Sequence, residues 1–155
     1  MRIATTAFTA FSIILGAASA SHAQMDGYWT AFTDENGGSL GMLFPEYSEN
    51  ELVGLILRCD IGSQTIEIFQ DTGHTSPQQN AIVALIIDGE RVDVDAVSEF
   101  NDMNEVWDSV ARVPYNSPAA QKIAASSSLS LVANPDLLPL HYEAEKNAWK
   151  EGCRL

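Results

Sequence analysis

The densest group of side chains capable of chemistry is acidic and falls between residues 88 and 108. Carboxylates bind Ca²⁺, and a pair about 5 Å apart can act in retaining glycoside hydrolysis. The segment lacks a D-x-D-x-D-G calcium loop, and acidic residues along a strand are also typical of a solvated face that discourages edge aggregation. A third interpretation is a docking face for a basic partner. Glu105 and Asp108 extend the run, whose candidate partner-binding residues are Asp88, Glu90, Asp93, Asp95, Glu99 and Asp102.

Two cysteines, Cys59 and Cys153, form the second pair of reactive groups. An even number of cysteines in an exported chain indicates a disulfide, and one intramolecular pairing exists. A metal site would need more ligands than two remote cysteines offer. In the chain-entropy model, a bridge that closes a loop of this length raises the free energy of unfolding by about 4–5 kcal/mol. We therefore predict a Cys59–Cys153 disulfide.

Histidines and serines offer a weaker case for catalysis. His74 falls in a polar stretch and His141 precedes the last helix, without metal-ligand spacing around either. The chain has neither a G-x-S-x-G nucleophile elbow nor a glycine-rich phosphate loop. We expect no enzyme activity, no catalytic residue, no metal and no cofactor, with a hydrolase using His74 or the carboxylates as the alternative. The three tryptophans fit either a carbohydrate platform or the core.

The N-terminus has the pattern of a secretory signal peptide. Arg2 gives a positive start, Ala7 to Ala20 is apolar, and Ser21-His22-Ala23 fits a signal peptidase site. The apolar run is shorter than the ~20 residues that span a bilayer. We expect cleavage after Ala23, a single β-rich domain over residues 24–155, a periplasmic or secreted location, and no membrane insertion of the mature chain.

The net charge is −13, from 8 basic and 21 acidic residues, and loss of Arg2 makes it one unit more negative. Such a surface repels nucleic acid and anionic lipid head groups. It favours a cationic partner, or serves solubility alone. The sequence leaves the oligomeric state open.

Hydrophobic patterning predicts mostly strands. Ile66 and Ile68 share one face by a period of two, and Asp88-Gly89 is a hairpin turn signal. Residues 34–38 and 60–63 read as turns, and 71–80 as a long loop. The segment 101–113 suits either a strand or a helical turn, and we favour a strand. The other expected strands cover residues 27–33, 40–44, 52–58, 64–70, 81–87, 91–97, 129–132 and, as a short addition, 137–140.

Two helices complete the pattern. Ser117 and Pro118 are cap and first-turn signals for a helix over 119–125. A last helix begins at Tyr142 and stops at Gly152. Its spacing places Tyr142, Lys146 and Trp149 on one side, with Ala148 and Cys153 close to it. The predicted fold is an α+β domain, a mostly antiparallel β-sheet or sandwich with this helix packed on it and tied by the disulfide.

The layout from residue 52 onward resembles the type VI secretion-associated periplasmic accessory proteins of bacteria. The matching segments cover about two-thirds of the chain and are Leu55-Ile56-Leu57-Arg58-Cys59, Thr65-Ile66-Glu67-Ile68, Ile87-Asp88-Gly89, Leu129-Ser130-Leu131 and Cys153. The resemblance implies a small exported protein and supplies no catalytic residues. We expect a non-enzymatic binding or accessory protein of the bacterial envelope. An inhibitor or immunity-type protein, with an acidic face against a basic cell-wall hydrolase, is the alternative.

Overall fold

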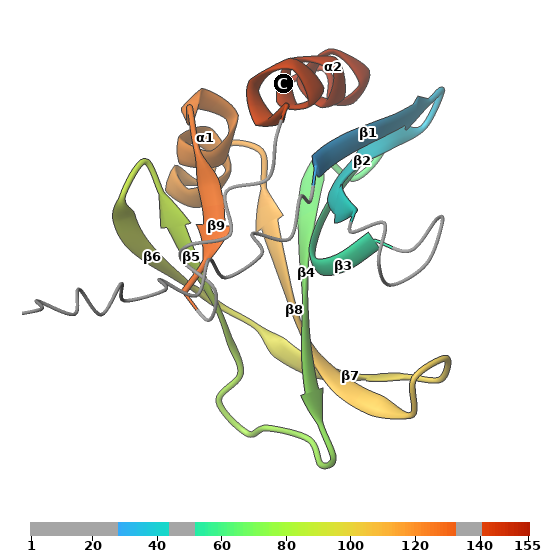
Figure 1. Cartoon of the computed structure of the whole chain (residues 1–155). Helices are drawn as coiled ribbons and strands as arrows, with labels where there is room; N and C mark the ends of the chain where they lie inside the picture. Colours follow the sequence, from blue (N-terminus) through green and yellow to red (C-terminus); the bar gives the residue numbers. More distant parts are fainter. Residues whose placement is uncertain (1–27, 44–51, 133–140) are drawn as a thin grey trace, which may run out of the picture.

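A computed structural model describes residues 28–43, 52–132 and 141–155, where two antiparallel sheets and two helices surround one core (Figure 1). The predicted signal peptide, the connection after residue 45 and the short strand at 137–140 lie outside these residues. The predicted α+β class, with antiparallel strands and a C-terminal helix, is confirmed.

The larger sheet has six strands in the order β1-β2-β3-β4-β8-β7. All neighbouring pairs are antiparallel. The apolar strand predicted to be central lies between β2 and β4. The strands are β1 (Tyr28–Asp34), β2 (Gly37–Leu43), β3 (Leu52–Asp60), β4 (Thr65–His74), β7 (Val97–Asn101) and β8 (Val106–Pro114).

The smaller sheet contains β5 (Ile82–Ile87), β6 (Glu90–Asp95) and β9 (Leu129–Leu131), in the order β6-β5-β9. The single strand predicted over 91–97 is wrong in one respect, because the chain changes sheets at Ala96. Its amide still donates to the carbonyl of Ala81 beside β5, at 3.0 Å, whereas Val97 already pairs with Val110 of β8. The run from β6 to β7 therefore joins the two sheets.

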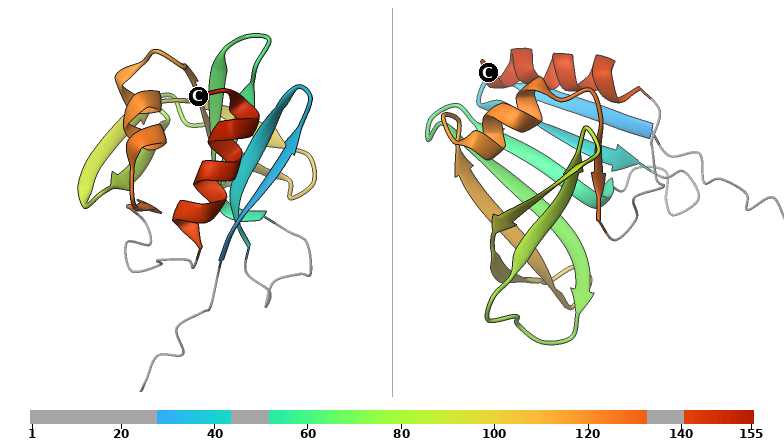
Figure 2. Two further views of the ribbon diagram at one scale, coloured as in Figure 1. Left: turned by 90° about the horizontal axis from the view of Figure 1, so that it is seen from above. Right: turned by 90° about the vertical axis from the view of Figure 1, so that its left-hand side faces the viewer.

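Two helices lie together at the top of Figure 1. Helix α1 (Pro118–Ala125) begins as predicted, since Ser117 Oγ accepts a hydrogen bond from the Ala120 amide at 3.2 Å. Helix α2 (Tyr142–Cys153) packs on β1 and β2, and the side view of Figure 2 shows it running above both strands. The helices cover the side of the strands that carries the buried residues.

The core follows the predicted alternation. Ile66 and Ile68 of β4 and Val83, Leu85 and Ile87 of β5 are fully buried. Trp29 and Trp149 are also buried, which places them in the core and not on a carbohydrate platform. Burial of large apolar side chains on this scale is the main stabilising term of a domain.

The structure changes the bounds of one predicted turn and one predicted loop, and it resolves one ambiguous segment. The first hairpin turn contains only Glu35 and Asn36, and Gly37 starts β2, where a Cβ would lie 2.2 Å from the carbonyl oxygen of Cys59. The predicted loop at 71–80 begins later, because β4 continues to His74 with a register shift after Gln70. The ambiguous segment 101–113 contains the end of β7, a turn and most of β8, so a strand is correct for its second half.

Helix α2 does not stop at Gly152. It continues to Cys153 and ends at Arg154, which adopts a left-handed conformation with φ of 57°. Gly152 is needed for close packing, because a Cβ there would lie 2.4 Å from Cγ2 of Thr33 on β1. Tyr142, Lys146 and Trp149 share the buried side as predicted, whereas Ala148 is exposed.

The Cys59–Cys153 disulfide joins the end of β3 to the last turn of α2. Its Cα atoms are 5.7 Å apart, within the usual range for a disulfide, and its partners are 94 residues apart in sequence. Both cysteines are buried. The predicted pairing is confirmed.

Cys153→Ser should lower the free energy of unfolding by about 4 kcal/mol, because the unfolded chain regains the entropy of a long loop. Urea denaturation with circular dichroism measures this loss. The double variant Cys59→Ser/Cys153→Ser should lose about the same amount. A loss below about 1 kcal/mol in both variants would show that the bridge constrains little.

Gly152→Ala should destabilise the protein by about 1–2 kcal/mol, because overpacking against Thr33 outweighs the gain in helix propensity. Glu151→Ala, an exposed neighbour on the same helix, is the control and should be close to neutral. Adding Thr33→Ala should restore part of the stability. Thermal denaturation of all four proteins tests this, and a neutral Gly152→Ala would rule out the close contact.

Candidate interaction surface

The candidate acidic residues lie along the run that joins the two sheets. Asp88 is in the β5–β6 turn, Glu90, Asp93 and Asp95 are on β6, Glu99 is on β7, and Asp102 follows β7. These six residues therefore do not share a single strand face. They follow one run of chain that passes from the smaller sheet to the larger.

Four of the six already have partners within the protein. Glu90 pairs with Lys122 at 2.7 Å, Asp93 with Arg91 at 2.8 Å, and Glu99 with Arg112 at 2.6 Å. Asp88 Oδ1 accepts hydrogen bonds from the amides of Ser127 and Ser128, both at 2.8 Å. These backbone bonds lower the pKa of Asp88. Its contribution to stability is therefore present above the ordinary carboxyl pKa and is lost as the pH falls through the lowered value.

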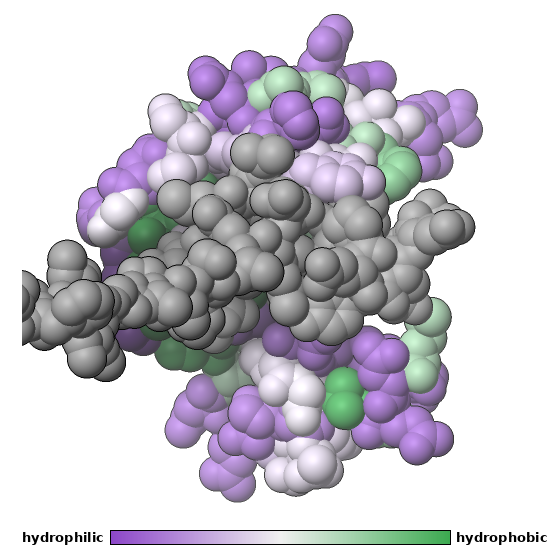
Figure 3. Space-filling view, in the orientation of Figure 1, coloured by the Kyte–Doolittle hydropathy of each residue, from purple (hydrophilic) through white to green (hydrophobic). Residues whose placement is uncertain are grey.

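Asp95 and Asp102 differ from the other four. No ion pair or side-chain hydrogen bond joins either one to another residue in the described ranges. Between them in sequence lie Val97 and Phe100, which are 54% and 49% exposed, and Met103 follows at 89%. In Figure 3 the lower part of the molecule, where β7 and its turn lie in Figure 1, mixes hydrophobic with hydrophilic residues. Asp95 and Asp102 thus fall on the same segment of chain as these exposed apolar side chains.

A ladder of alternating charges, which the sequence patterns did not predict, crosses the outer side of four strands. Glu67 forms ion pairs with Arg112 at 2.9 Å and with Arg58 at 3.9 Å, and Arg112 also pairs with Glu99. The hydrogen bond from Arg112 lowers the pKa of Glu99. The period-two pattern of β4 places Glu67 on the face opposite Ile66 and Ile68, so its outward position could be predicted from the sequence. Its partners could not, because they depend on the order of the strands in the sheet. Exposed pairs of this kind are worth about 0–1 kcal/mol each.

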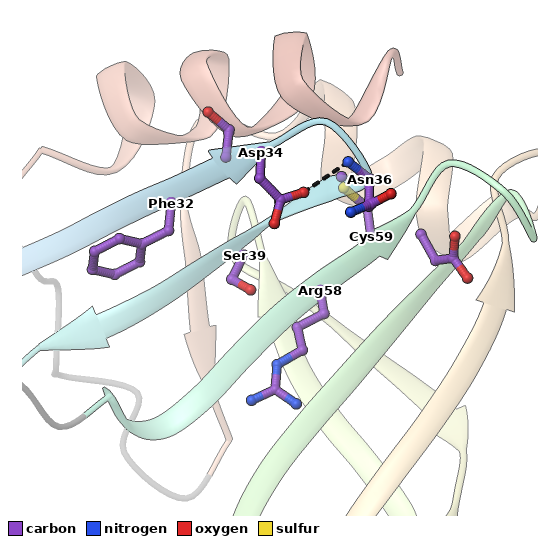
Figure 4. Close-up of a pocket in the computed structure, with 10 residues that line it drawn as sticks. Phe32, Asp34, Asn36, Ser39, Arg58 and Cys59 are labelled. Carbon is purple, nitrogen blue, oxygen red and sulfur yellow. Dashed lines mark hydrogen bonds between the residues drawn. The ribbon is translucent and has the colours of Figure 1, made fainter.

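An open concavity of about 530 Å³ lies on the same outer side, over β1, β2 and β3 (Figure 4). Phe32, Ser39 and Arg58 project from three neighbouring strands, and Figure 4 shows Asp34 held toward the turn by the Asn36 amide at 2.7 Å. Small residues on β2 leave the floor open between Phe32 and Arg58. This surface is polar and shallow, and Phe32 on it is 60% exposed.

Asp71 and Asp108 are neighbouring carboxyl groups. Asp108 is 1% exposed and accepts hydrogen bonds from the Thr72 amide at 3.2 Å and from Asn101 Nδ2 at 2.9 Å. Partial burial raises the pKa of Asp71, and the nearby charge of Asp108 raises it further. The donors to Asp108 come from the adjoining strands, so this residue of β8 holds the irregular end of β4 and the end of β7 in place.

Neither histidine occupies a reactive cluster. His74 is exposed at the end of β4 opposite Trp107, and His141 is exposed at the start of α2 without a side-chain capping bond. Among the described residues no three histidine, cysteine or acidic side chains are arranged to hold a metal ion. Within the same ranges, no helix has the length and apolar character needed to cross a membrane.

A buried polar cluster connects the two helices. Lys146, 6% exposed, donates from Nζ to the carbonyl of Ser126 at the end of α1, and Tyr142 OH lies 2.6 Å from Ser126 Oγ. The negative end of the α1 dipole favours a cation at this place. Ser126 Oγ donates to the carbonyl of Ile123, so Tyr142 is the donor to Ser126. Burial raises the pKa of Tyr142 to about 12.

Comparison with known proteins found no family model, curated protein or solved structure that matches this chain.

Tyr142→Phe should cost about 1 kcal/mol near neutral pH by removing the bond to Ser126. It should also change the response to alkali. Because the folded pKa lies above the unfolded value of about 10, this tyrosine's stability contribution is intact below pH ~10 and is lost as the pH rises toward 12. The loss amounts to about 2–3 kcal/mol, and the variant should lack it.

Urea denaturation at several pH values from about 8 to 11.5 measures both effects. Tyr28→Phe, which changes a half-buried tyrosine on β1, is the control and should leave the pH dependence as in the wild type. Equal alkaline slopes for Tyr142→Phe and the wild type would disprove the role given to Tyr142.

Proposed function

We propose that this protein is an exported, non-enzymatic binding protein of the bacterial envelope, and that it binds a cationic protein through the segment Glu90–Met103. The main support is that Asp95 and Asp102 lack internal ion pairs within the described residues. They share their segment of chain with the exposed side chains of Val97, Phe100 and Met103. Carboxylates next to apolar side chains offer both electrostatic attraction and desolvated contact area.

The proposal of export draws on the signal-peptide pattern and on the disulfide. Disulfides persist in oxidising compartments and are rare in the reducing cytosol. The resemblance to secretion-associated periplasmic proteins is consistent with the same compartment. A basic cell-wall hydrolase is a partner of suitable charge, in which case binding would inhibit the hydrolase.

The negative charge of the whole chain supports binding of a cationic partner but does not by itself locate the contact. Long-range attraction raises the rate of encounter with a basic protein, and salt screens it over about 8–10 Å. Contacts that decide the complex come from a smaller patch at its centre. Glu90–Met103 is the segment on which acidic and exposed apolar residues coincide.

The immobilised mature protein should capture a basic protein from envelope extract at low salt and release it between about 0.05 and 0.5 M NaCl. The variant Asp95→Asn/Asp102→Asn should lose most of this capture. The matched variant Glu143→Gln/Glu151→Gln removes the same charge from exposed positions on α2 and should retain it.

Mass spectrometry identifies the captured protein, and a binding isotherm with the purified pair gives the salt dependence. Capture that is unaffected by salt, equal loss in the two variants, or no basic protein in the eluate would each refute the proposal.

A further inference from the structure

Strand β7 ends the six-stranded sheet and pairs with β8 on one side, with no strand of the described chain on the other. Alternate residues of an edge strand direct their N–H and C=O groups away from the sheet, where another strand can bind them. Edges are commonly protected by charged side chains. On β7, Val97 and Phe100 are about half exposed, so the protection is weak.

A second concavity, of about 280 Å³, lies at the start of this edge and is lined by Asp95, Ala96, Val97, Val110 and Arg112. Val110 is 3% exposed and contributes an apolar floor. Arg112 is neutralised by Glu67 and Glu99, at 2.9 and 2.6 Å. Asp95 forms no ion pair with a described residue. The concavity therefore combines an apolar floor with an acidic rim.

These features select among possible occupants. Symmetric antiparallel pairing of β7 with a second copy, centred on Glu99, places Glu99 opposite its own equivalent, and like charges directly opposite are destabilising. Two chains of net charge −13 also repel each other. A lysine or arginine fits better, because its aliphatic stem can lie on Val97 and Val110 while its head group reaches Asp95.

We infer that the β7 edge is the docking site for an extended segment of a cationic partner, which adds to the sheet as a seventh strand and places one lysine or arginine in the concavity beside Asp95. This rests on the proposed function, since it specifies how the cationic partner binds. Main-chain hydrogen bonds along Val97–Asn101 give affinity, and the concavity gives the preference for a basic side chain.

The probe is a capped synthetic peptide of roughly eight residues with alternating lysine and valine, which favours an extended strand. Its control has the same number of lysines but prolines in place of two valines. Proline lacks the amide donor and cannot pair along an edge. With the full mature chain, the valine peptide should bind tenfold or more tightly than the proline peptide.

Variants locate the site. Asp95→Asn and Val97→Thr should each weaken binding of the valine peptide about threefold to tenfold. Glu151→Gln on α2 and Phe32→Thr on β1 remove a similar charge and an exposed apolar side chain at positions away from β7, and should bind as the wild type does. Amide hydrogen exchange should slow within Val97–Asn101 when the valine peptide is bound.

Each alternative has its own result. Equal, salt-sensitive binding of both peptides, without protection of β7, overturns the docking mode but leaves electrostatic binding of a cationic protein intact. Concentration-dependent protection of β7 without peptide, with a dimer in sedimentation, shows a second copy as occupant and also overturns it. If neither peptide binds, the docking mode is refuted, and the capture experiment decides separately whether a basic protein is bound.

Discussion

The disulfide between Cys59 and Cys153 determines which end of the large sheet is open. It fixes the last turn of α2 at the end of β3, so the helix must run back over β2 and β1. There Glu145 accepts a hydrogen bond from the Ala31 amide of β1 at 2.8 Å. A side chain of α2 thus accepts the hydrogen bond of a main-chain amide on β1, the strand at one end of the sheet. The strand at the other end of the sheet, β7, receives no such cover from the described residues.

Net charge is a poor guide to the binding surface of this molecule. Glu90, Asp93 and Glu99 meet cationic side chains within the protein, and Asp88 holds the connection between α1 and β9. Their charge contributes to the long-range field, but their oxygen atoms already have partners. Asp95 is different because Arg112, the cation that lines the same concavity, forms its ion pairs with Glu67 and Glu99. The pattern of internal pairing, and not charge density, singles out the position.

Local signals in the sequence predicted what depends on local physics. Period-two alternation identified Ile66 and Ile68 as core residues, Ser117 marked the start of α1, and Asp88-Gly89 marked a turn in which both residues adopt positive φ. Features that depend on strand order were missed, such as the ladder through Glu67 and Arg112. Lys146 was placed correctly on the inner side of α2, but its charge finds its partner at the end of another helix.

The change of sheet at Ala96 separates two edge strands, β6 and β7, that differ in their exposed side chains. The smaller sheet also ends in an unpaired strand, β6, but its exposed residues are charged, and Arg91 and Asp93 pair with each other there. Charges along an edge oppose the approach of another strand because they must lose water. After Ala96 the exposed positions become Val97 and Phe100. A docking strand therefore loses less hydration on β7, and Asp95, the last acidic residue of β6, stands where it can select a cation.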